Sequence, residues 1–161
     1  MTRMIRIVPR NDDASVLPGM LLHLSDMKGF VVADPVPDFR GWEVLLPDGR
    51  RVGAVEDVIV DTTELEVKYV EVKVDHDVIA ASEDTWVLVQ ASAAHIRNND
   101  DRVVIDWLPI AGIAGAPRSS RRLPTHEDER ATQDYFTARR RSGEDESLDK
   151  AHLWESRNSA R

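Results

Sequence analysis

The sequence predicts a mainly β protein, a small antiparallel barrel with an extended N-terminal segment and a C-terminal helical region. Three observations lead to this prediction: three apolar runs lie between Asp38 and Val74, two turn signals separate them, and the composition changes after residue 111. The runs are rich in β-branched and aromatic residues, which fit a pleated surface. We therefore expect an N-terminal segment over 1–40, a barrel over 41–111, an irregular crossing segment over 112–124 and a helix with a tail over 125–161.

The first two runs form the clearest hairpin. Pro47-Asp48-Gly49-Arg50 joins Glu43–Leu46 to Arg51–Val60. Proline presets φ, aspartate can hydrogen-bond to its own backbone, and glycine accepts a positive φ. A second turn, Asp61-Thr62-Thr63-Glu64, leads into Leu65–Val74 and completes a β-meander.

The third run changes its apolar phase near Tyr69, because alternate apolar residues in 65–69 have one parity and those in 70–74 have the other. A bulge or sharp bend there would let one long strand turn a barrel corner. Strand periodicity then places seven side chains mainly inside: Val44, Val58, Val60, Val67, Val72, Leu88 and Ile105.

Segments on either side of the meander extend the prediction. Trp86–Val89 and Val103–Trp107 are further strands, and Asn98–Asp101 is a polar hairpin turn before the second of them. Val16–Leu24 is apolar but contains Pro18-Gly19, which favours an extended segment over a helix. A strand or extended arm is expected in Met1–Pro9.

A helix is predicted after Thr125, which has the side chain of an N-cap and is followed by three acidic residues. It would run to about Arg140, with a thin apolar face at Ala131, Tyr135 and Phe136. Leu148, Ala151 and Trp154 then repeat at helical spacing in the tail, and a tryptophan in a polar tail suggests docking.

Composition narrows the class of function. The 161 residues have a formal net charge of −8, which argues against a nucleic-acid partner, and no cysteine, which rules out disulfides and thiol nucleophiles. No stretch approaches the roughly 20 apolar residues that cross a bilayer. Nucleophile, phosphate-loop and metalloprotease motifs are missing, and the five histidines are scattered. These observations favour a protein that is not an enzyme and holds no metal.

Three polar groups have a functional and a simpler interpretation. Asp57, Asp61 and Glu64 could converge at a strand end, but solvated turn residues are the default. Asp75-His76-Asp77 could bind a metal, although an exposed turn is the simpler interpretation. The arginines at 118, 121 and 122 could grip phosphate or anionic lipid, or be a solvated linker.

Five segments of the predicted barrel form a recognisable set: Gly41-Trp42-Glu43-Val44, Asp48-Gly49, Val52-Gly53-Ala54-Val55, Asp57-Val58-Ile59-Val60-Asp61 and Lys68-Tyr69-Val70-Glu71-Val72. In these segments the chain resembles the PRC-barrel, the β-barrel of the H subunit of type-II photosynthetic reaction centres. Flanking segments occur in the same order as in H: His23–Phe30 with Val32-Ala33, Pro37–Trp42, and Ala114–Pro117 followed by Thr125–Glu129. The resemblance covers roughly Leu17 to Phe136.

This resemblance implies a role without a reaction of its own. An H-type subunit caps the cytoplasmic face of the L- and M-type membrane subunits, shields the secondary quinone site and carries part of its proton route. Bacteriochlorophyll, bacteriopheophytin and quinone would then belong to the partner subunits, and this chain would bind no cofactor directly. The implied location is peripheral, on the cytoplasmic face of the photosynthetic inner membrane.

Site residues follow from the same resemblance. Asp61 and Glu64 fall on acidic positions that the family uses for proton transfer, and Asp57 is a further candidate. The family's histidine pair would fall at about Val16 and Pro18, where this sequence has none, so His23, His76 and His126 remain substitutes to consider. The proposed partner contacts are Leu21, Leu22, Phe30 and Trp154.

The chain departs from the H family because it lacks the transmembrane helix and the glycine-rich, aromatic ending. It would therefore be half of a split H subunit, whose membrane helix is a separate chain, or an additional subunit beside a complete H. Light-harvesting subunits are further partners to consider. The alternative function is a free-standing PRC-barrel adaptor in another assembly, such as ribosome maturation; an enzyme with a site that no motif reveals is a third class.

Overall fold

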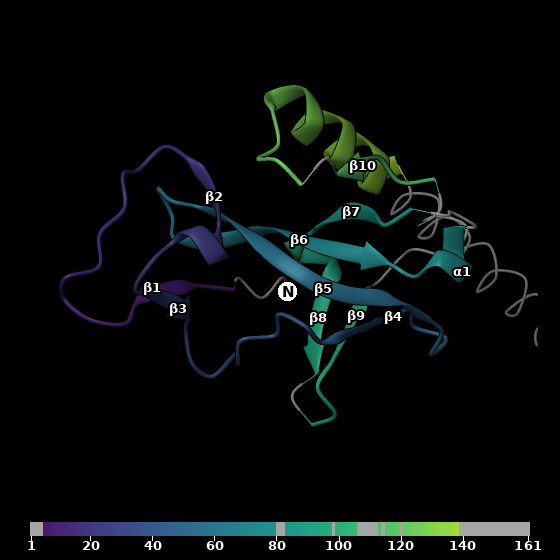
Figure 1. The fold of residues 1–161 in the computed structure, drawn as a ribbon, viewed down its shortest axis with the longest axis horizontal. Helices are drawn as coiled ribbons and strands as arrows, with labels where there is room; N and C mark the ends of the chain where they lie inside the picture. Colours follow the sequence, from purple (N-terminus) through teal and green to yellow (C-terminus); the bar gives the residue numbers. More distant parts are fainter. Residues whose placement is uncertain are drawn as a thin grey trace, which may run out of the picture.

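The computed structural model of the protein describes residues 5–79, 83–97, 99–105, 113, 115–119 and 121–138. Its strands are β1 (Ile7–Pro9), β2 (Leu21–His23), β3 (Phe30–Val32), β4 (Glu43–Leu45), β5 (Arg51–Asp61), β6 (Glu66–Val74), β7 (Thr85–Gln90), β8 (Ala94–Arg97), β9 (Arg102–Ile105) and β10 (Arg118–Ser119). Its helical segments are η1 (Leu24–Asp26), α1 (His76–Ile79), η2 (Ala91–Ala93) and a C-terminal helix over 126–138. The mainly β prediction is confirmed (Figure 1).

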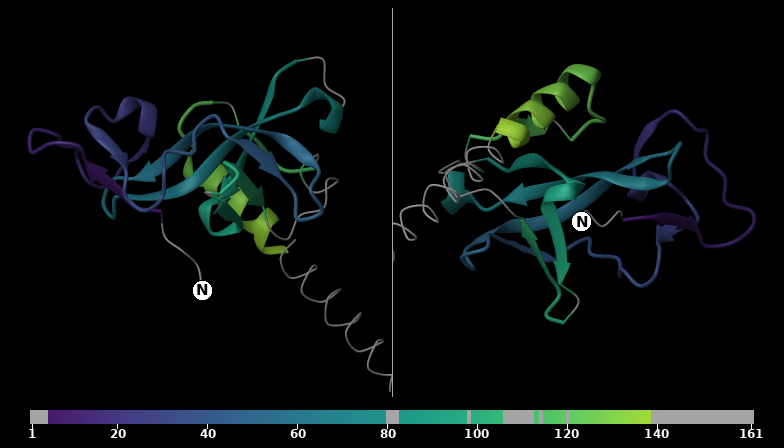
Figure 2. Two further views of the ribbon diagram at one scale, coloured as in Figure 1. Left: turned by 90° about the horizontal axis from the view of Figure 1, so that it is seen from below. Right: turned by 180° about the vertical axis from the view of Figure 1, so that it is seen from behind.

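The main sheet has eight strands: seven lie in the order β10-β7-β6-β5-β4-β9-β8, and the eighth, β2, pairs with β5. β2 and β4 share one edge of the long β5, because β4 pairs at Arg51–Ala54 and β2 pairs at Ile59–Asp61. The N-terminal segment therefore contributes a strand to the sheet. β1 and β3 pair separately as a two-stranded sheet at one end of the long axis of the molecule (Figures 1 and 2).

The sheet differs from an ideal antiparallel barrel in two details. Among the described strands none joins β10 to β8, so the predicted closed or nearly closed barrel is not fully closed. The pairing of β4 with β9 is parallel, so the expectation of an all-antiparallel sheet is wrong. Alternation of apolar residues reports which side chains share a face, but it carries no information on strand direction or on closure.

The predicted bulge near Tyr69 is confirmed. Ile59 faces Tyr69 and the next residue, Val60, faces Val67, so Lys68 is an extra residue in β6. A second irregularity leaves Glu56 extra in β5. Each bulge changes which side chains point to the inner face, and the one at Lys68 explains the phase change in the sequence.

The inner face of the sheet builds the main core. All seven side chains that were expected inside are buried, each at 6% exposure or less. Leu88 is buried but does not lie on the inner face. It packs on the outer face of the sheet with Ile59 and Tyr69. Gly53 permits the close approach of β5 and β6, since a Cβ there would lie 2.0 Å from the Lys73 carbonyl oxygen.

The C-terminal helix lies beside β10 and β7, against the outer face of the sheet (Figures 1 and 2). Its predicted N-cap is confirmed as a reciprocal pair: the Asp128 N–H donates to Thr125 Oγ1 at 3.1 Å, and the Thr125 N–H donates to Asp128 Oδ2 at 3.0 Å. The buried face of the helix is Thr132 and Phe136, while Ala131, which was expected there, is exposed.

Candidate functional site

The outer face of β5 and β6 brings together most of the sequence-predicted site residues. A small apolar cluster of Ile59, Tyr69 and Leu88, with Leu21 packed against it, occupies this face. The segment that follows residue 113 covers part of it, because Ser119 contacts Glu71 and the C-terminal helix contacts Tyr69. An open groove lies at the end of this face that the segment after residue 113 leaves uncovered.

The groove has a volume of about 480 Å³ and runs between the loop before β2, the turn after β5 and the start of the C-terminal helix. Six of the side chains that line it are Met20, Leu21, Asp61, Lys68, Leu123 and His126. The structure therefore places the partner-contact candidate Leu21 and the proton-transfer candidate Asp61 in the same groove. These two residues are 40 positions apart and meet because β2 pairs with the end of β5.

Two of the side chains that line the groove are apolar and exposed. Met20 is 43% exposed and Leu123 is 39% exposed. Leu17, three residues before Met20 in the chain, is 73% exposed. Exposed apolar side chains grouped among polar residues are typical of a protein interaction site. Leu17 and Leu123 were not singled out from the sequence, where an isolated leucine in a polar segment carries no distinctive signal.

Asp61 has a structural task as well. Its Oδ1 accepts hydrogen bonds from the Thr63 N–H at 2.8 Å and the Glu64 N–H at 3.4 Å, so its carboxylate closes the turn after β5. Its side chain remains half-buried in the groove wall. Glu64 is exposed in the same turn.

Asp57 lies apart from these two residues, so the three carboxylates do not converge. Asp57 and Asp61 are four residues apart on β5, which separates them by about 13 Å at the usual rise of a strand. Asp57 is buried at 5% exposure and accepts hydrogen bonds from Ser25 Oγ and from the Val58 N–H. Its partners are therefore internal to the domain.

Glu129 on the C-terminal helix ties that helix to the bulge in β6. Its Oε1 lies 2.8 Å from Lys68 Nζ and accepts a hydrogen bond from the Tyr69 hydroxyl at 3.2 Å. Burial and the neighbouring Glu129 charge raise the pKa of Tyr69 to about 12, because both disfavour the phenolate. Tyr69 is therefore a neutral hydrogen-bond donor that holds the helix beside the groove.

Among the described residues Glu71 is the most deeply buried carboxylate, at 0% exposure, and it lies opposite Asp57 in the β5–β6 ladder. Ser119 Oγ donates to its Oε2 at 3.0 Å, and His23 Nε2 lies 3.7 Å from the same oxygen. Arg121 Nε lies 3.6 Å from Oε1. Sequence reasoning did not single out Glu71 as a site residue; the available signal was an acidic residue inside a valine-rich strand.

The other predicted partner contacts are differently placed. Phe30 is only 8% exposed and belongs to the main core, so its side chain does not form part of a docking surface in this structure. Leu22 is half-buried and packs against the same core. Trp154 lies outside the described residues.

The substitute histidines are dispersed. His23 is buried beside Glu71, His76 contacts Asp84 at 3.0 Å in α1, and His126 is fully exposed at the start of the C-terminal helix. Among the described residues no group of three histidine or acidic side chains is arranged to hold a metal ion. The helices described here include none long and apolar enough to cross a membrane.

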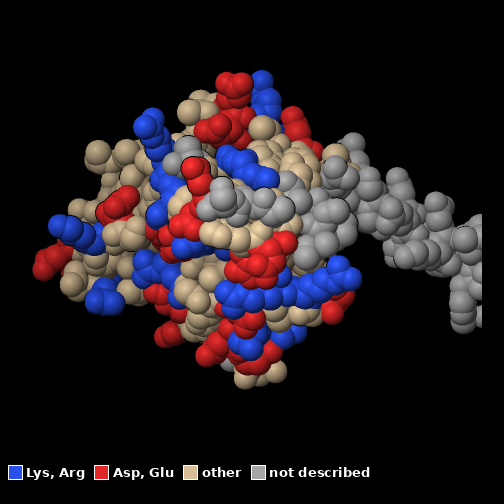
Figure 3. Space-filling view, turned by 45° about the vertical axis from the view of Figure 1, so that its right-hand side comes forward, with Lys and Arg blue, Asp and Glu red and all other residues tan. Residues whose placement is uncertain are grey.

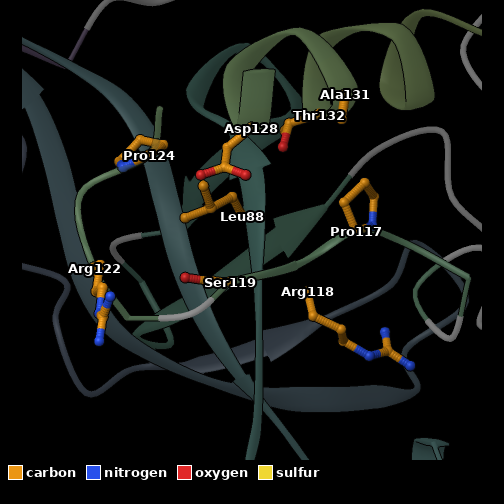
Figure 4. Close-up of a pocket in the computed structure, with 9 residues that line it drawn as sticks. All are labelled: Leu88, Pro117, Arg118, Ser119, Arg122, Pro124, Asp128, Ala131 and Thr132. Carbon is orange, nitrogen blue, oxygen red and sulfur yellow. The ribbon is translucent and has the colours of Figure 1, made fainter. Parts of the chain in front are cut away.

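The arginines at 118–122 do not converge on an anion site. A small pocket of about 90 Å³ lies between this segment and the C-terminal helix. In Figure 4, Asp128 and Thr132 extend from the helix towards Leu88, whereas the side chains of Arg118 and Arg122 extend away on opposite sides. Basic and acidic side chains are also interspersed on the face shown in Figure 3.

Fold and site together define a mainly β domain whose open sheet carries a groove on its partly covered outer face. Residues 33–108 match the family model of the PRC-barrel domain. The chain therefore contains a PRC-barrel domain, over a range close to the 41–111 expected from the sequence. No curated protein matches the chain.

Proposed function

We propose that this chain is a non-catalytic, H-type subunit that caps the cytoplasmic face of a type-II photosynthetic reaction centre. It would dock on the L- and M-type membrane subunits, stabilise the complex and shield the secondary quinone site. Bacteriochlorophyll, bacteriopheophytin and quinone would remain in those partners. A separate chain with the H membrane helix and light-harvesting subunits are further candidate neighbours.

The groove is the observation that carries this proposal. Met20 and Leu123 are exposed apolar residues on its rim, and Leu21 lies within it. Removing such side chains from water on docking is favourable, and a few anchors of this kind usually supply most of the binding energy of an interface. The H-like order of the flanking segments supports the choice of partner, and the PRC-barrel match is compatible with it.

The proposal also includes a second role, the delivery of protons to the secondary quinone site. Quinone reduction takes up two protons below a surface that excludes bulk water, so carboxylates must carry them inward. Asp61 suits this task because its side chain is half-buried in the groove wall, at the end of a strand. Glu64 is exposed in the same turn, where it can exchange protons with water.

Co-isolation tests the docking proposal. The tagged full chain, recovered from detergent-solubilised native membranes, should carry the bacteriochlorophyll absorption of the reaction centre. Met20→Asp and Leu123→Asp should each reduce the recovered pigment at least tenfold, because a charge on the rim must be desolvated on docking. Val8→Asp is the matched control, since Val8 is 37% exposed on β1 and does not line the groove.

Each outcome has a defined meaning. Pigment that is lost with both rim variants and retained with Val8→Asp supports docking through the groove. Wild-type chain that is recovered without pigment contradicts the capping role, and recovery with ribosomal proteins would identify the adaptor alternative.

The proton role has its own test. Asp61→Asn with Glu64→Gln preserves size and hydrogen bonding but removes both titrating groups. Assembled complexes should show a slower second electron transfer to quinone, most clearly at high pH where free protons are scarce, and a nearly unchanged first transfer. A second-transfer rate that stays the same across pH would mean that the two residues only shape the turn.

A further inference from the structure

Within the described part of the chain, three buried polar side-chain atoms lack a hydrogen-bond partner: His23 Nε2, Glu71 Oε1 and Trp86 Nε1. The guanidinium of Arg121 lies over the Trp86 ring, 5.0 Å from its centroid, and Arg121 Nε lies 3.6 Å from Glu71 Oε1. Unpaired buried polar atoms are uncommon in folded proteins and each leaves a desolvation penalty uncompensated.

The surroundings of Glu71 are acidic. Asp57 lies opposite it across the β5–β6 ladder, and Glu56 lies 3.2 Å from Arg121. Asp26 lies 3.9 Å from the far side of His23. Because a cation stabilises an ionised carboxylate that is buried beside other carboxylates, this region is electrostatically suited to a positively charged group.

Arg121 supplies a positive charge near Glu71 but makes no hydrogen bond with it. Its 3.6 Å separation from Glu71 is beyond hydrogen-bond distance, whereas Arg51 and Arg102 each lie 2.9 Å from a partly exposed carboxylate. Its side chain is 45% exposed and its φ is 66°, in the left-handed region that a non-glycine residue seldom adopts. Of these three pairs of a carboxylate and an arginine, the pair with the most buried carboxylate therefore has the longest separation.

The backbone beside Arg121 makes few contacts within the described part of the chain. There β10 pairs with β7 at Arg118, opposite Val87, and at Ser119, opposite Trp86. The Arg121 N–H donates to Ser119 Oγ at 3.1 Å. We call residues 115–119, 121 and 122 the strap. The strap occupies an edge of β7 where a longer extended segment could pair, and strand addition at a sheet edge is a common mode of peptide recognition.

We propose that the β7 edge beside Glu71 is a binding site for an arginine-bearing extended segment of a partner protein, and that the strap is an exchangeable internal ligand of this site. A guanidinium matches a carboxylate in a bidentate way and stacks on an indole ring, so a better-placed arginine would bond Glu71 Oε1 and remain over Trp86. A carbonyl of the incoming backbone would accept from Trp86 Nε1. This proposal does not depend on the capping function, because none of these residues lines the groove.

A free guanidinium compound tests the recognition step. In the full chain carrying Arg121→Ala, millimolar ethylguanidinium should shift the indole N–H resonance of Trp86, which a Trp86→Phe variant assigns. Adding Glu71→Gln should weaken this binding at least tenfold. Arg102→Ala is the matched control, since it removes an arginine that pairs with the partly exposed Glu43, and it should leave the Trp86 resonance unaffected by the compound. Equal binding with and without Glu71→Gln would overturn the proposal.

A peptide tests the exchange step. The peptide Gly-Ala-Pro-Arg-Ser-Ser-Arg-Arg, which repeats residues 115–122, should bind the Arg121→Ala chain at least tenfold more tightly than the wild-type chain, whose own arginine competes. Replacing the seventh peptide residue by glutamine should weaken binding at least tenfold. If ethylguanidinium binds and the peptide does not, Arg121 only holds the strap against the sheet, and the exchange proposal fails.

A second variant covers the case in which Arg121→Ala does not fold. Arg121→Lys keeps the positive charge but loses the planar, bidentate geometry, so it should still bind the peptide more tightly than wild type does. Peptide affinity for Arg121→Lys equal to that for wild type would show that any cation suffices, which contradicts recognition of arginine.

Discussion

The two faces of the β5–β6 pair are built from the same strands but are stabilised in different ways. The inner face is a layer of buried aliphatic side chains, among them Val58, Val60 and Val72. The outer face carries the buried carboxylates Asp57 and Glu71 beside a small apolar cluster. The inner face packs on strands of the same domain, whereas the outer face is buried because the segment after residue 113 lies over part of it.

This difference separates the folding core from the surface available for recognition. Apolar burial on the inner face is non-directional and tolerates small changes in geometry. On the outer face, burial depends on the direction and distance of a few polar contacts, so a loosely matched group such as Glu71 can be improved by another molecule. We therefore expect changes to the inner face to affect stability most and changes to the outer face to affect binding.

The largest effect is expected from the inner core. Phe39→Ala removes a side chain with 0% exposure from the main core and should lower the free energy of unfolding by about 3–5 kcal/mol. Urea denaturation, with an unchanged m-value, measures it. A loss below about 1 kcal/mol would contradict the assignment of this side to the folding core.

A smaller loss in the free energy of unfolding is expected from a substitution in the strap, where Arg121 contacts the outer face of the sheet. Arg121→Ala removes the arginine beside the buried Glu71 carboxylate, and we expect a loss of about 1–3 kcal/mol, because a buried charge then loses a neighbouring opposite charge. The same denaturation experiment measures it. Restoring stability by adding Glu71→Leu would confirm the cause, because an apolar residue in that place needs no counter-charge.

The Tyr69 hydroxyl gives a pH-dependent prediction for the same face. Its pKa is about 12 in the folded protein against an ordinary 10.0, so the unfolded chain loses this proton first. The contribution to stability is complete below pH 10 and is lost as the pH rises through 12. Phenolate absorbance should show a late-titrating tyrosine that disappears in Tyr69→Phe, and Glu129→Gln should lower its pKa. An unchanged titration in Glu129→Gln would exclude the helix contact as a cause.

The smallest effect is expected from an exposed ion-pair network on the sheet. Arg51 lies 2.9 Å from Asp75 and 3.3 Å from Glu43, and all three side chains are partly solvated. Arg51→Ala should cost about 1 kcal/mol or less, and less again in high salt. Suppose that Arg51→Ala lowered the free energy of unfolding as much as Arg121→Ala at every ionic strength. The burial of the carboxylate that each arginine contacts would then have no effect on stability.

The sequence predicted the inner face well because strand alternation depends only on local residues. The β4–β6 meander, the bulge near Tyr69 and the burial of all seven expected side chains followed from that pattern. Strand direction, sheet closure and the outward placement of Leu88 did not follow, because they depend on pairing between distant segments. Phe30 was taken as a surface contact since nothing local shows that β3 buries it.

Prediction of the site was limited by the same physics. Asp61 and Leu21 were selected separately, and their shared groove results from the pairing of β2 with β5. Glu71 was missed because its burial depends on Ser119, 48 residues away in the chain. A single sequence gives no signal for such a contact.

Docking through the groove is the central claim, and site-specific photocrosslinking tests it most directly. A photoreactive residue at Met20 or at Leu123 should crosslink the chain to a membrane subunit of the reaction centre in native membranes. The same residue at Asp48, which is exposed in the turn between β4 and β5, is the control. We predict crosslinks from the two rim positions and none from the control. Crosslinks from Asp48 in the absence of crosslinks from Met20 and Leu123 would contradict the account.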